Sequence, residues 1–365
     1  MSTKKNKLIV ILSGGGAKAA FQAGAWQWIK QQGILLSGTI FVPDVPNGVF
    51  GVSGGGLNGV MIASGKHQQL FDLWNEIAGN PSEIYTSDFI SQENEKIIFN
   101  SEKITKYLLS ELSLLQKAGL LFKRSRKKVI SKIFDRLRNM KSLASSEPLM
   151  SKLNDLVSIE GIKSEVFQAG FVSLTDGNYY APSHFEYNSD ADFQKGVMAS
   201  ADIPVLWSPI DRISLSNFEL THLVDGGVRN ATPFGDAVDY INQSEDADYH
   251  FLVISCHTGR VDKMEGEPNV LNVAKRSLAD LISTEVQQND LSTFLQVNKL
   301  VKQAESKGIE LKNSKGQKLK AFKVKTIQPN RELGFALDFS RTSVLDSFAH
   351  GFQRASKILR IPEWD

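Results

Sequence analysis

A serine within a short glycine-rich stretch is the clearest sign of chemistry in this sequence. Residues 51–55 read Gly-Val-Ser-Gly-Gly, which fits the pattern Gly-x-Ser-x-Gly around Ser53. Such a serine occupies a strained turn between a strand and a helix, so Gly51 and Gly55 must be small. The positive end of the helix dipole then favours an alkoxide and an oxyanion. The pattern predicts nucleophilic acyl chemistry, although a chain with 28 glycines could also match it by chance.

A nucleophilic serine needs a base, and Asp225 is the best-placed carboxylate. The stretch Leu-Val-Asp-Gly-Gly puts Asp225 at the end of an apolar strand. The glycines that follow, Gly226 and Gly227, allow other backbone to come close. An ordinary Asp-Gly β-turn explains this stretch equally well when it is taken alone.

The six histidines are candidates for a conventional triad. His257 is the strongest of them because it follows a buried apolar run. His222 precedes Asp225 by three residues, so on a strand the two side chains face opposite ways. A surface or capping role is favoured for the others, His67, His184, His250 and His350. The sequence contains no paired-cysteine or His-Glu-x-x-His spacing, which favours the absence of a metal site and of any cofactor.

Three consecutive glycines, Gly14, Gly15 and Gly16, follow the first apolar run. Their backbone N–H groups could bind the phosphates of a nucleotide or could form an oxyanion hole. A dinucleotide site also requires an acidic residue about 20 positions on, and residues 33–40 contain none. A phosphate-binding loop with Gly-Lys-Ser/Thr fails as well, because alanines flank Lys18. The oxyanion hole is therefore favoured.

The elements that must position these residues alternate as strand, turn and helix. Residues 7–12 form a continuous apolar run, typical of a strand covered on both faces, and residues 17–32 have helical spacing. The same order recurs at 48–65, and two such units predict an α/β sandwich. Further strands are expected at 165–182, 221–225 and 249–259, a hairpin at 308–329, and a polar, mostly helical stretch without strands at 71–152.

Composition places the chain among ordinary soluble globular proteins. Of its 365 residues, 41% are hydrophobic and 22% are charged, and the net charge of +2 gives no global attraction to nucleic acid or membrane. The lysines before the first apolar run resemble the start of a signal peptide. The run is, however, shorter than the usual minimum of about seven residues. No stretch approaches the roughly 20 apolar residues of a membrane span. With a single cysteine, Cys256, these features predict a cytoplasmic protein.

Taken in order, these motifs resemble the patatin-like phospholipase family. Residues 14–18 are similar to its glycine-rich oxyanion block, 51–55 to its nucleophile elbow, and 225–227 to its catalytic aspartate motif. Two more blocks, at 199–209 and 230–233, also resemble the family. The likeness extends loosely to the tail at 337–359.

One position departs from the family pattern, which usually continues with glycine after the basic residue of the oxyanion block. Here the basic residue is Lys18 and the position after it is Ala19. An alanine one turn into the helix is a mild change, so we expect the oxyanion hole to persist. Lys18 opposes the dipole of the helix that it begins, which suggests pairing with a carboxylate or a helix end, with solvent exposure as the alternative.

The resemblance implies one α/β/α domain at 7–359 with a helical insertion at about 71–152. It implies a dyad in place of a triad, with Ser53 as nucleophile, Asp225 as base, and an oxyanion hole from the three glycines and Gly54. The expected function is lipid acyl hydrolysis of the phospholipase A type. Two alternatives remain: an esterase or acyl thioesterase with the same dyad, or a catalytically silent regulator that binds lipid or a partner.

A strongly basic segment lies within the insertion. Residues 117–143 contain ten lysines and arginines against a single acidic residue, Asp135. Four apolar residues share one helical face, Ile130, Ile133, Phe134 and Leu137. Contact with an anionic membrane is one interpretation, and a helix that covers the active site or packs on the sheet with a solvated basic face is the other. Nucleic acid is not expected, because aromatic residues are few in this segment.

Overall fold

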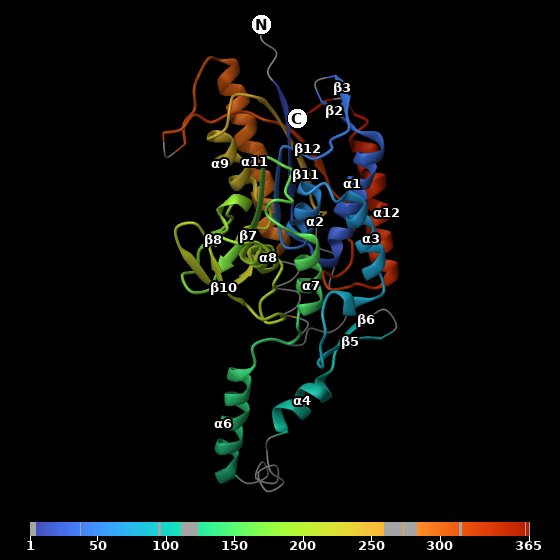
Figure 1. The fold of residues 1–365 in the computed structure, drawn as a ribbon, viewed down its shortest axis with the longest axis vertical. Helices are drawn as coiled ribbons and strands as arrows, with labels where there is room; N and C mark the ends of the chain where they lie inside the picture. Colours follow the sequence, from blue (N-terminus) through green and yellow to red (C-terminus); the bar gives the residue numbers. More distant parts are fainter. Residues whose placement is uncertain are drawn as a thin grey trace.

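A mixed sheet runs through the middle of the molecule (Figure 1). The computed structural model describes residues 5–36, 38–93, 96–110, 123–258, 273, 283–313, 316–361 and 363–364. The strand order is β12-β11-β1-β4-β7-β10-β9, and β8 pairs with β7. The strands are β1 (Asn6–Leu12), β4 (Gly48–Val52), β7 (Val166–Ser173), β8 (Tyr179–Tyr180), β9 (Ile210–Ser214), β10 (Glu219–Asp225), β11 (Asp248–Ile254) and β12 (Lys323–Ile327). The strands from β12 to β7 run parallel, whereas β8, β9 and β10 form antiparallel pairs.

Strand β1 shows why the centre of the sheet is buried on both faces. Leu8, Val10 and Leu12 belong to one hydrophobic core, and the alternating residues Ile9 and Ile11 belong to the other. All five side chains are fully buried. A continuous apolar run is therefore what this position requires. The predicted strand at 7–12 is confirmed.

Helices cover both faces of the sheet. One face carries α1 (Ala20–Gln32), α2 (Gly54–Ala63), α3 (His67–Ile77), α8 (Asp190–Ala199) and α12 (Arg341–Ile358). The other face carries α9 (Phe234–Asn242) and α11 (Ser283–Ser306). In Figure 1, α9 and α11 lie on one side of the strands, and α1, α3 and α12 lie on the other. The predicted three-layer α/β/α fold is confirmed.

The segment between α3 and β7 is more varied than expected. It contains η2 (Pro81–Glu83), β5 (Ile90–Glu93), β6 (Lys96–Phe99), α4 (Ser101–Leu109), α6 (Lys123–Asn139) and α7 (Glu147–Leu156). The antiparallel pair β5–β6 corrects the expectation that no strand occurs there. The predicted hairpin at 308–329 is found in part: Lys312 and Lys318 form an antiparallel bridge, whereas β12, which follows, pairs in parallel with β11.

Helices α4 and α6 project from the body of the molecule (Figure 1), and we call these two helices the arm. They touch each other, with the Arg136 guanidinium 4.2 Å from the centre of the Tyr107 ring. The predicted basic segment begins at residues 117–122, which lie outside the described residues, and continues in α6. Within the described part of the chain, no helix combines the length and the apolar character that crossing a membrane requires.

The strand register brings two distant chain segments to one place. Val52 at the end of β4 pairs with Gly170 of β7, and Asp225 at the end of β10 pairs with Phe171. Strands β4 and β10 lie on opposite sides of β7, and both end beside the consecutive β7 residues Gly170 and Phe171. Whatever follows Val52 must lie close to Asp225.

Candidate active site

Ser53 occupies the sharp turn between β4 and α2, and its φ is 58°. This left-handed value costs a non-glycine residue about 1–3 kcal/mol, so the surroundings must hold it. A Cβ at Gly51 would lie 2.4 Å from the carbonyl oxygen of Gly55. One at Gly55 would lie 2.5 Å from the carbonyl oxygens of Leu12 and Ser13. The turn can therefore form only with glycine at both positions.

The carboxyl group of Asp225 interacts with the hydroxyl of Ser53. Its Oδ1 accepts the backbone N–H of Gly227 at 2.7 Å. Burial raises the pKa of Asp225 to about 6, and the interactions with Ser53 and with the Gly227 N–H oppose the rise. A Cβ at Gly226 would lie 2.3 Å from the carbonyl oxygen of Gly170, so a glycine after Asp225 lets β10 end directly against β7. With a pKa of about 6, this carboxyl group is mostly ionised at neutral pH.

The three-glycine loop packs directly against Ser53. A Cβ at Gly14 would lie 3.3 Å from the Cβ of Ser53. The N–H of Gly14 donates to the carbonyl oxygen of Ala231 at 3.0 Å, so it is already occupied. The N–H groups of Gly15 and Gly16 have no acceptor among the described residues. Within this loop, the N–H groups of Gly15 and Gly16 are therefore available to a ligand, and Gly14 packs closely against Ser53.

Gly54, the first residue of α2, adjoins the same loop. A Cβ there would lie 3.3 Å from the backbone nitrogen of Gly16 and 2.8 Å from the Cβ of Ala19. The methyl group of Ala19 thus fits because residue 54 is glycine, and it leaves the loop undistorted. The neighbouring Lys18 is buried, and its Nζ lies 4.0 Å from Oε2 of Glu332, which gives this cation a carboxylate partner.

The structure does not assemble a triad around His257. This residue follows β11, and burial, with the positive charge of Lys18 as a smaller cause, lowers the pKa of His257 to about 3. A group with so low a pKa is a poor base at neutral pH. In the described part of the chain, no histidine hydrogen-bonds to Ser53 or Asp225. Nor do three or more histidine, cysteine or acidic side chains there form a group that could hold a metal ion.

Two residues that the sequence analysis did not single out hold the turn and the base in place. The hydroxyl of Ser200 accepts the backbone N–H of Ser53 at 3.0 Å. The carbonyl oxygen of Asp202 accepts the backbone N–H of Asp225 at 2.9 Å. Both belong to the block at 199–209, whose resemblance to the family was the one signal in the sequence that pointed to them.

Asp202 also places a second carboxyl group near Asp225. Its side chain is fully buried, and Oδ1 accepts the hydroxyl of Ser146 at 3.4 Å. Burial, and secondly the negative charge of Asp225, raise the pKa of Asp202 to about 8. Of the two carboxyl groups, Asp202 therefore keeps its proton to the higher pH.

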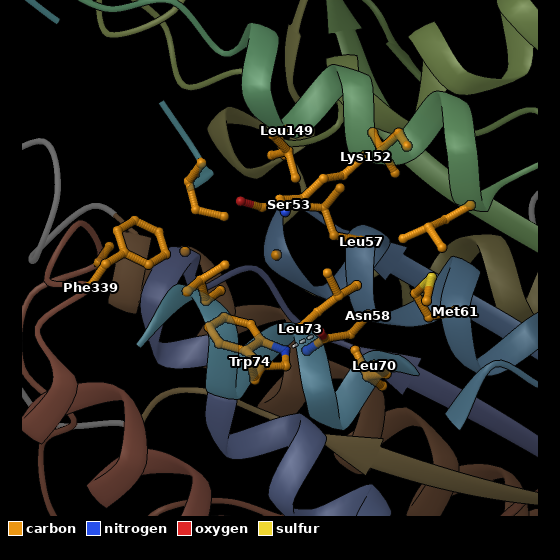
Figure 2. Close-up of a pocket in the computed structure, with 18 of the residues that line it drawn as sticks. Ser53, Leu57, Asn58, Met61, Leu70, Leu73, Trp74, Leu149, Lys152 and Phe339 are labelled. Carbon is orange, nitrogen blue, oxygen red and sulfur yellow. Dashed lines mark hydrogen bonds between the residues drawn. The ribbon is translucent and has the colours of Figure 1, made fainter. Parts of the chain in front are cut away.

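An apolar pocket adjoins Ser53 (Figure 2). Helices α2, α3 and α7 supply most of its wall. The apolar side chains that line it are Leu57, Met61, Leu70, Leu73, Trp74, Ile77, Ile84, Leu149, Leu153, Leu156, Ile203, Trp207 and Phe339. The amide of Asn58 is bonded to Trp74 and to backbone, and Lys152 pairs at 2.8 Å with both Glu76 and Glu83. The pocket therefore suits an alkyl chain.

Comparison with known proteins identifies a family and several similar solved structures. The model of the family described as patatin-like phospholipase matches residues 10–238. No curated protein gives a significant match to the sequence. Among solved structures, VipD from Legionella pneumophila is similar with a TM-score of 0.43 and 13% sequence identity, over 98% of this chain and 67% of that chain.

Proposed function

This chain belongs to the patatin-like phospholipase family, and from that premise we propose that it hydrolyses fatty-acyl esters of lipids by a Ser53–Asp225 dyad. The family supports lipid acyl hydrolysis in general. The phospholipase A type of reaction and the roles of the individual residues are our proposal. One observation carries it: the Ser53 side chain interacts with the buried carboxyl group of Asp225 and lines an apolar pocket.

The reaction begins when the Oγ of Ser53 attacks the ester carbonyl carbon and its proton passes to Asp225. The C–O bond to the alcohol then breaks, and Asp225 returns the proton to the leaving oxygen. This leaves an acyl-serine ester. A water molecule attacks that ester with Asp225 again as base, and the fatty acid is released as Ser53 regains its proton.

Backbone N–H groups stabilise the negative charge that develops on the carbonyl oxygen. The N–H groups of Gly15 and Gly16 have no acceptor in the part of the chain that the structure describes, and Gly54 begins the helix whose positive end points toward Ser53. Removal of one such donor in other enzymes costs about 3 kcal/mol of transition-state stabilisation. The close packing of Gly14 on Ser53 keeps this loop within reach of the reacting carbon.

We also propose that the arm contacts anionic membrane. Ile130, Phe134 and Leu137 lie on one face of α6, and their exposed fractions are 46, 61 and 45%. Basic residues flank this face, and the sequence of α6 contains eight basic residues and one acidic residue. An amphipathic helix of this kind buries its apolar side chains at the edge of the bilayer while its cations meet anionic head groups.

The chain segments that enter and leave the arm support this assignment. The segment before the arm contributes Trp74, Ile77 and Ile84 to the pocket wall, and α7 after it contributes Leu149 and Leu153. The chain therefore leaves the pocket wall to form the arm and returns to the pocket wall after it. Its contact with a membrane would bring the pocket close to the lipid substrate.

A fluorophosphonate probe, which forms a covalent bond with an activated serine, tests the dyad. We expect labelling of the wild type, no labelling of Ser53→Ala and strongly reduced labelling of Asp225→Asn. Asp236→Asn is the matched control, because burial also raises the pKa of Asp236 to about 6, yet that carboxylate bonds to Tyr179 instead. Equal labelling of the wild type and Ser53→Ala would place the nucleophile elsewhere.

A panel of substrates separates the alternative functions. Phospholipid vesicles, a neutral-lipid emulsion, a soluble ester and an acyl thioester are each incubated with the wild type and with Ser53→Ala. Release of fatty acid from phospholipid that depends on Ser53 supports the phospholipase. Hydrolysis of the soluble ester or the thioester alone supports the esterase or thioesterase. A folded wild type that takes no probe and hydrolyses none of the four supports a silent regulator.

A further inference from the structure

Helix α2 forms one wall of the pocket along its whole length. Ser53 precedes the helix, and Leu57 and Met61 follow at intervals of four residues, which puts them on the same face. All three line the pocket. Figure 2 shows them in a row, with Met61 farthest from Ser53. An acyl chain attached to Ser53 can therefore lie along this face of the helix.

The Met61 end of the pocket is closed and apolar. Met61 is 4% exposed, and Leu70 of α3, which also lines the pocket, is 3% exposed. The pocket also adjoins the three-glycine loop, because Gly16 lines it, as does Ala336, whose carbonyl oxygen accepts the N–H of Ala17 at 2.7 Å. The pocket therefore adjoins the proposed oxyanion donors near Gly16, and near Met61 it is lined by the apolar side chains of Met61 and Leu70.

The helix sets the length of this acyl channel. Eight residues separate Ser53 from Met61, which at about 1.5 Å per residue gives about 12 Å. An extended alkyl chain with C–C bonds of about 1.5 Å advances about 1.3 Å per carbon, so about nine carbons fill that distance. We infer that Met61 is the end stop of the acyl channel and a specificity-determining residue that sets a preference for acyl chains of about eight to ten carbons.

This inference rests on the proposed acyl hydrolysis, and the test is designed to distinguish failure of one from failure of the other. The kcat/KM of the wild type is measured for p-nitrophenyl esters of 4 to 16 carbons, with a maximum expected at 8–10. Met61→Ala removes three side-chain atoms, so its maximum should move about three carbons longer. The ratio of kcat/KM for 14 carbons to that for 8 carbons should rise about tenfold.

Met61→Phe, which shortens the channel, should move the maximum to shorter chains. Met198→Ala is the matched control, because Met198 is fully buried on α8 and does not line the pocket. Its profile should match the wild type even if its stability falls. Met61→Phe decides the question if Met61→Ala does not fold. Hydrolysis with the same profile in the wild type and the Met61 variants would overturn the inference, whereas no hydrolysis of any ester would overturn the proposed function.

Discussion

Charged groups at the active site and charged groups on the arm lie in opposite surroundings. Asp225 and Asp202 are almost completely buried, and burial is the main cause of the raised pKa of each. On α6, by contrast, even the apolar side chains Ile130, Phe134 and Leu137 face solvent. Electrostatic interactions are strong where water is excluded and are screened by salt where it is not. The buried active site is therefore suited to catalysis, and the exposed arm is suited to attraction to a charged surface.

The two regions also differ in how tightly the backbone is fixed. Around Ser53, glycines allow contacts that any Cβ would block, and hydrogen bonds from distant segments hold both Ser53 and Asp225. The arm makes few contacts beyond that between Arg136 and Tyr107 in the part of it that the structure describes. We expect substitutions at the site to cause large, salt-independent losses, and substitutions on the arm to cause small, salt-dependent ones.

Asp225→Asn should have the largest effect. The amide cannot accept the proton of Ser53, so kcat for a soluble ester should fall by a factor of about 10⁴. The loss should be the same in 50 mM and 500 mM NaCl, because the carboxylate is buried. Steady-state kinetics at the two salt concentrations checks this, with Asp236→Asn as the control. A loss that shrinks as salt rises would contradict the contrast between the two regions.

Gly15→Ala should have the next largest effect. The new Cβ would lie 2.7 Å from the Cβ of Cys256, so the loop must shift and its N–H groups must leave their positions. The kcat should fall by a factor of about 10², as for the loss of one oxyanion donor. Gly235→Ala is the control, since nothing lies within 4 Å of a Cβ at that position. Equal kcat in the two variants would remove Gly15 from the oxyanion hole.

Asp202→Asn should increase stability. The pKa of Asp202 in the folded protein is about 8, above its usual value of about 3.9, so the folded protein keeps a proton that the unfolded chain has lost between these pH values. The free energy of unfolding therefore falls as pH rises through this window. Asparagine has no proton to lose, so on these pKa values the variant should be more stable at pH 7.5 by up to roughly 5 kcal/mol.

Urea denaturation at several pH values measures this difference. The advantage of Asp202→Asn over the wild type should grow from pH 4 to pH 8. The exposed control Asp211→Asn should show no such trend. The contrary result is a constant difference in the free energy of unfolding between the wild type and Asp202→Asn from pH 4 to pH 8. That result would show that Asp202 is ionised in the folded protein.

The activity of the wild type should depend on the ionisation of Asp225. Burial raises the pKa of this base to about 6, and the base must be ionised to accept a proton. The kcat/KM for an uncharged soluble ester should therefore be constant above about pH 7 and should fall up to tenfold per pH unit below pH 6. A variant of the arm should have the same profile, because its charges are remote and screened. If the pH profile of kcat/KM differs between the wild type and the arm variant, the charges of the arm influence the pKa of Asp225.

The sequence was informative where a local pattern has one structural solution. The continuous apolar run of β1 and the glycines around Ser53 predict a buried strand and a sharp turn, because few alternatives satisfy them. The stretch Leu-Val-Asp-Gly-Gly likewise predicts a strand that ends at Asp225, and β10 does end there. These elements follow from their own residues.

Contacts between distant segments could not be predicted in this way. The hydrogen bond from the backbone N–H of Ser53 to the hydroxyl of Ser200 joins residues 147 positions apart, and the residues around each give no local pattern that predicts it. In β12, Lys323 and Lys325 alternate with apolar residues, a pattern typical of a strand with one face in solvent. Lys325 is in fact buried, and its Nζ lies 5.3 Å from the centre of the Trp364 ring. A long side chain can bury its stem while its cation meets aromatic and backbone partners, so alternation alone does not reveal exposure.

A single substitution on the arm should have the smallest effect. One cation near an anionic membrane contributes about 1 kcal/mol, so Lys132→Gln should weaken binding to vesicles that contain phosphatidylserine by about fivefold. The effect should fade in 500 mM NaCl, and the kcat for a soluble ester should not change. Lys299→Gln, an exposed lysine on α11 far from the arm in sequence, is the control and should bind like the wild type. Vesicle sedimentation measures the binding. If both variants weaken it equally, the attraction comes from overall charge, and the arm loses the separate role that its exposed apolar face and its basic residues suggest.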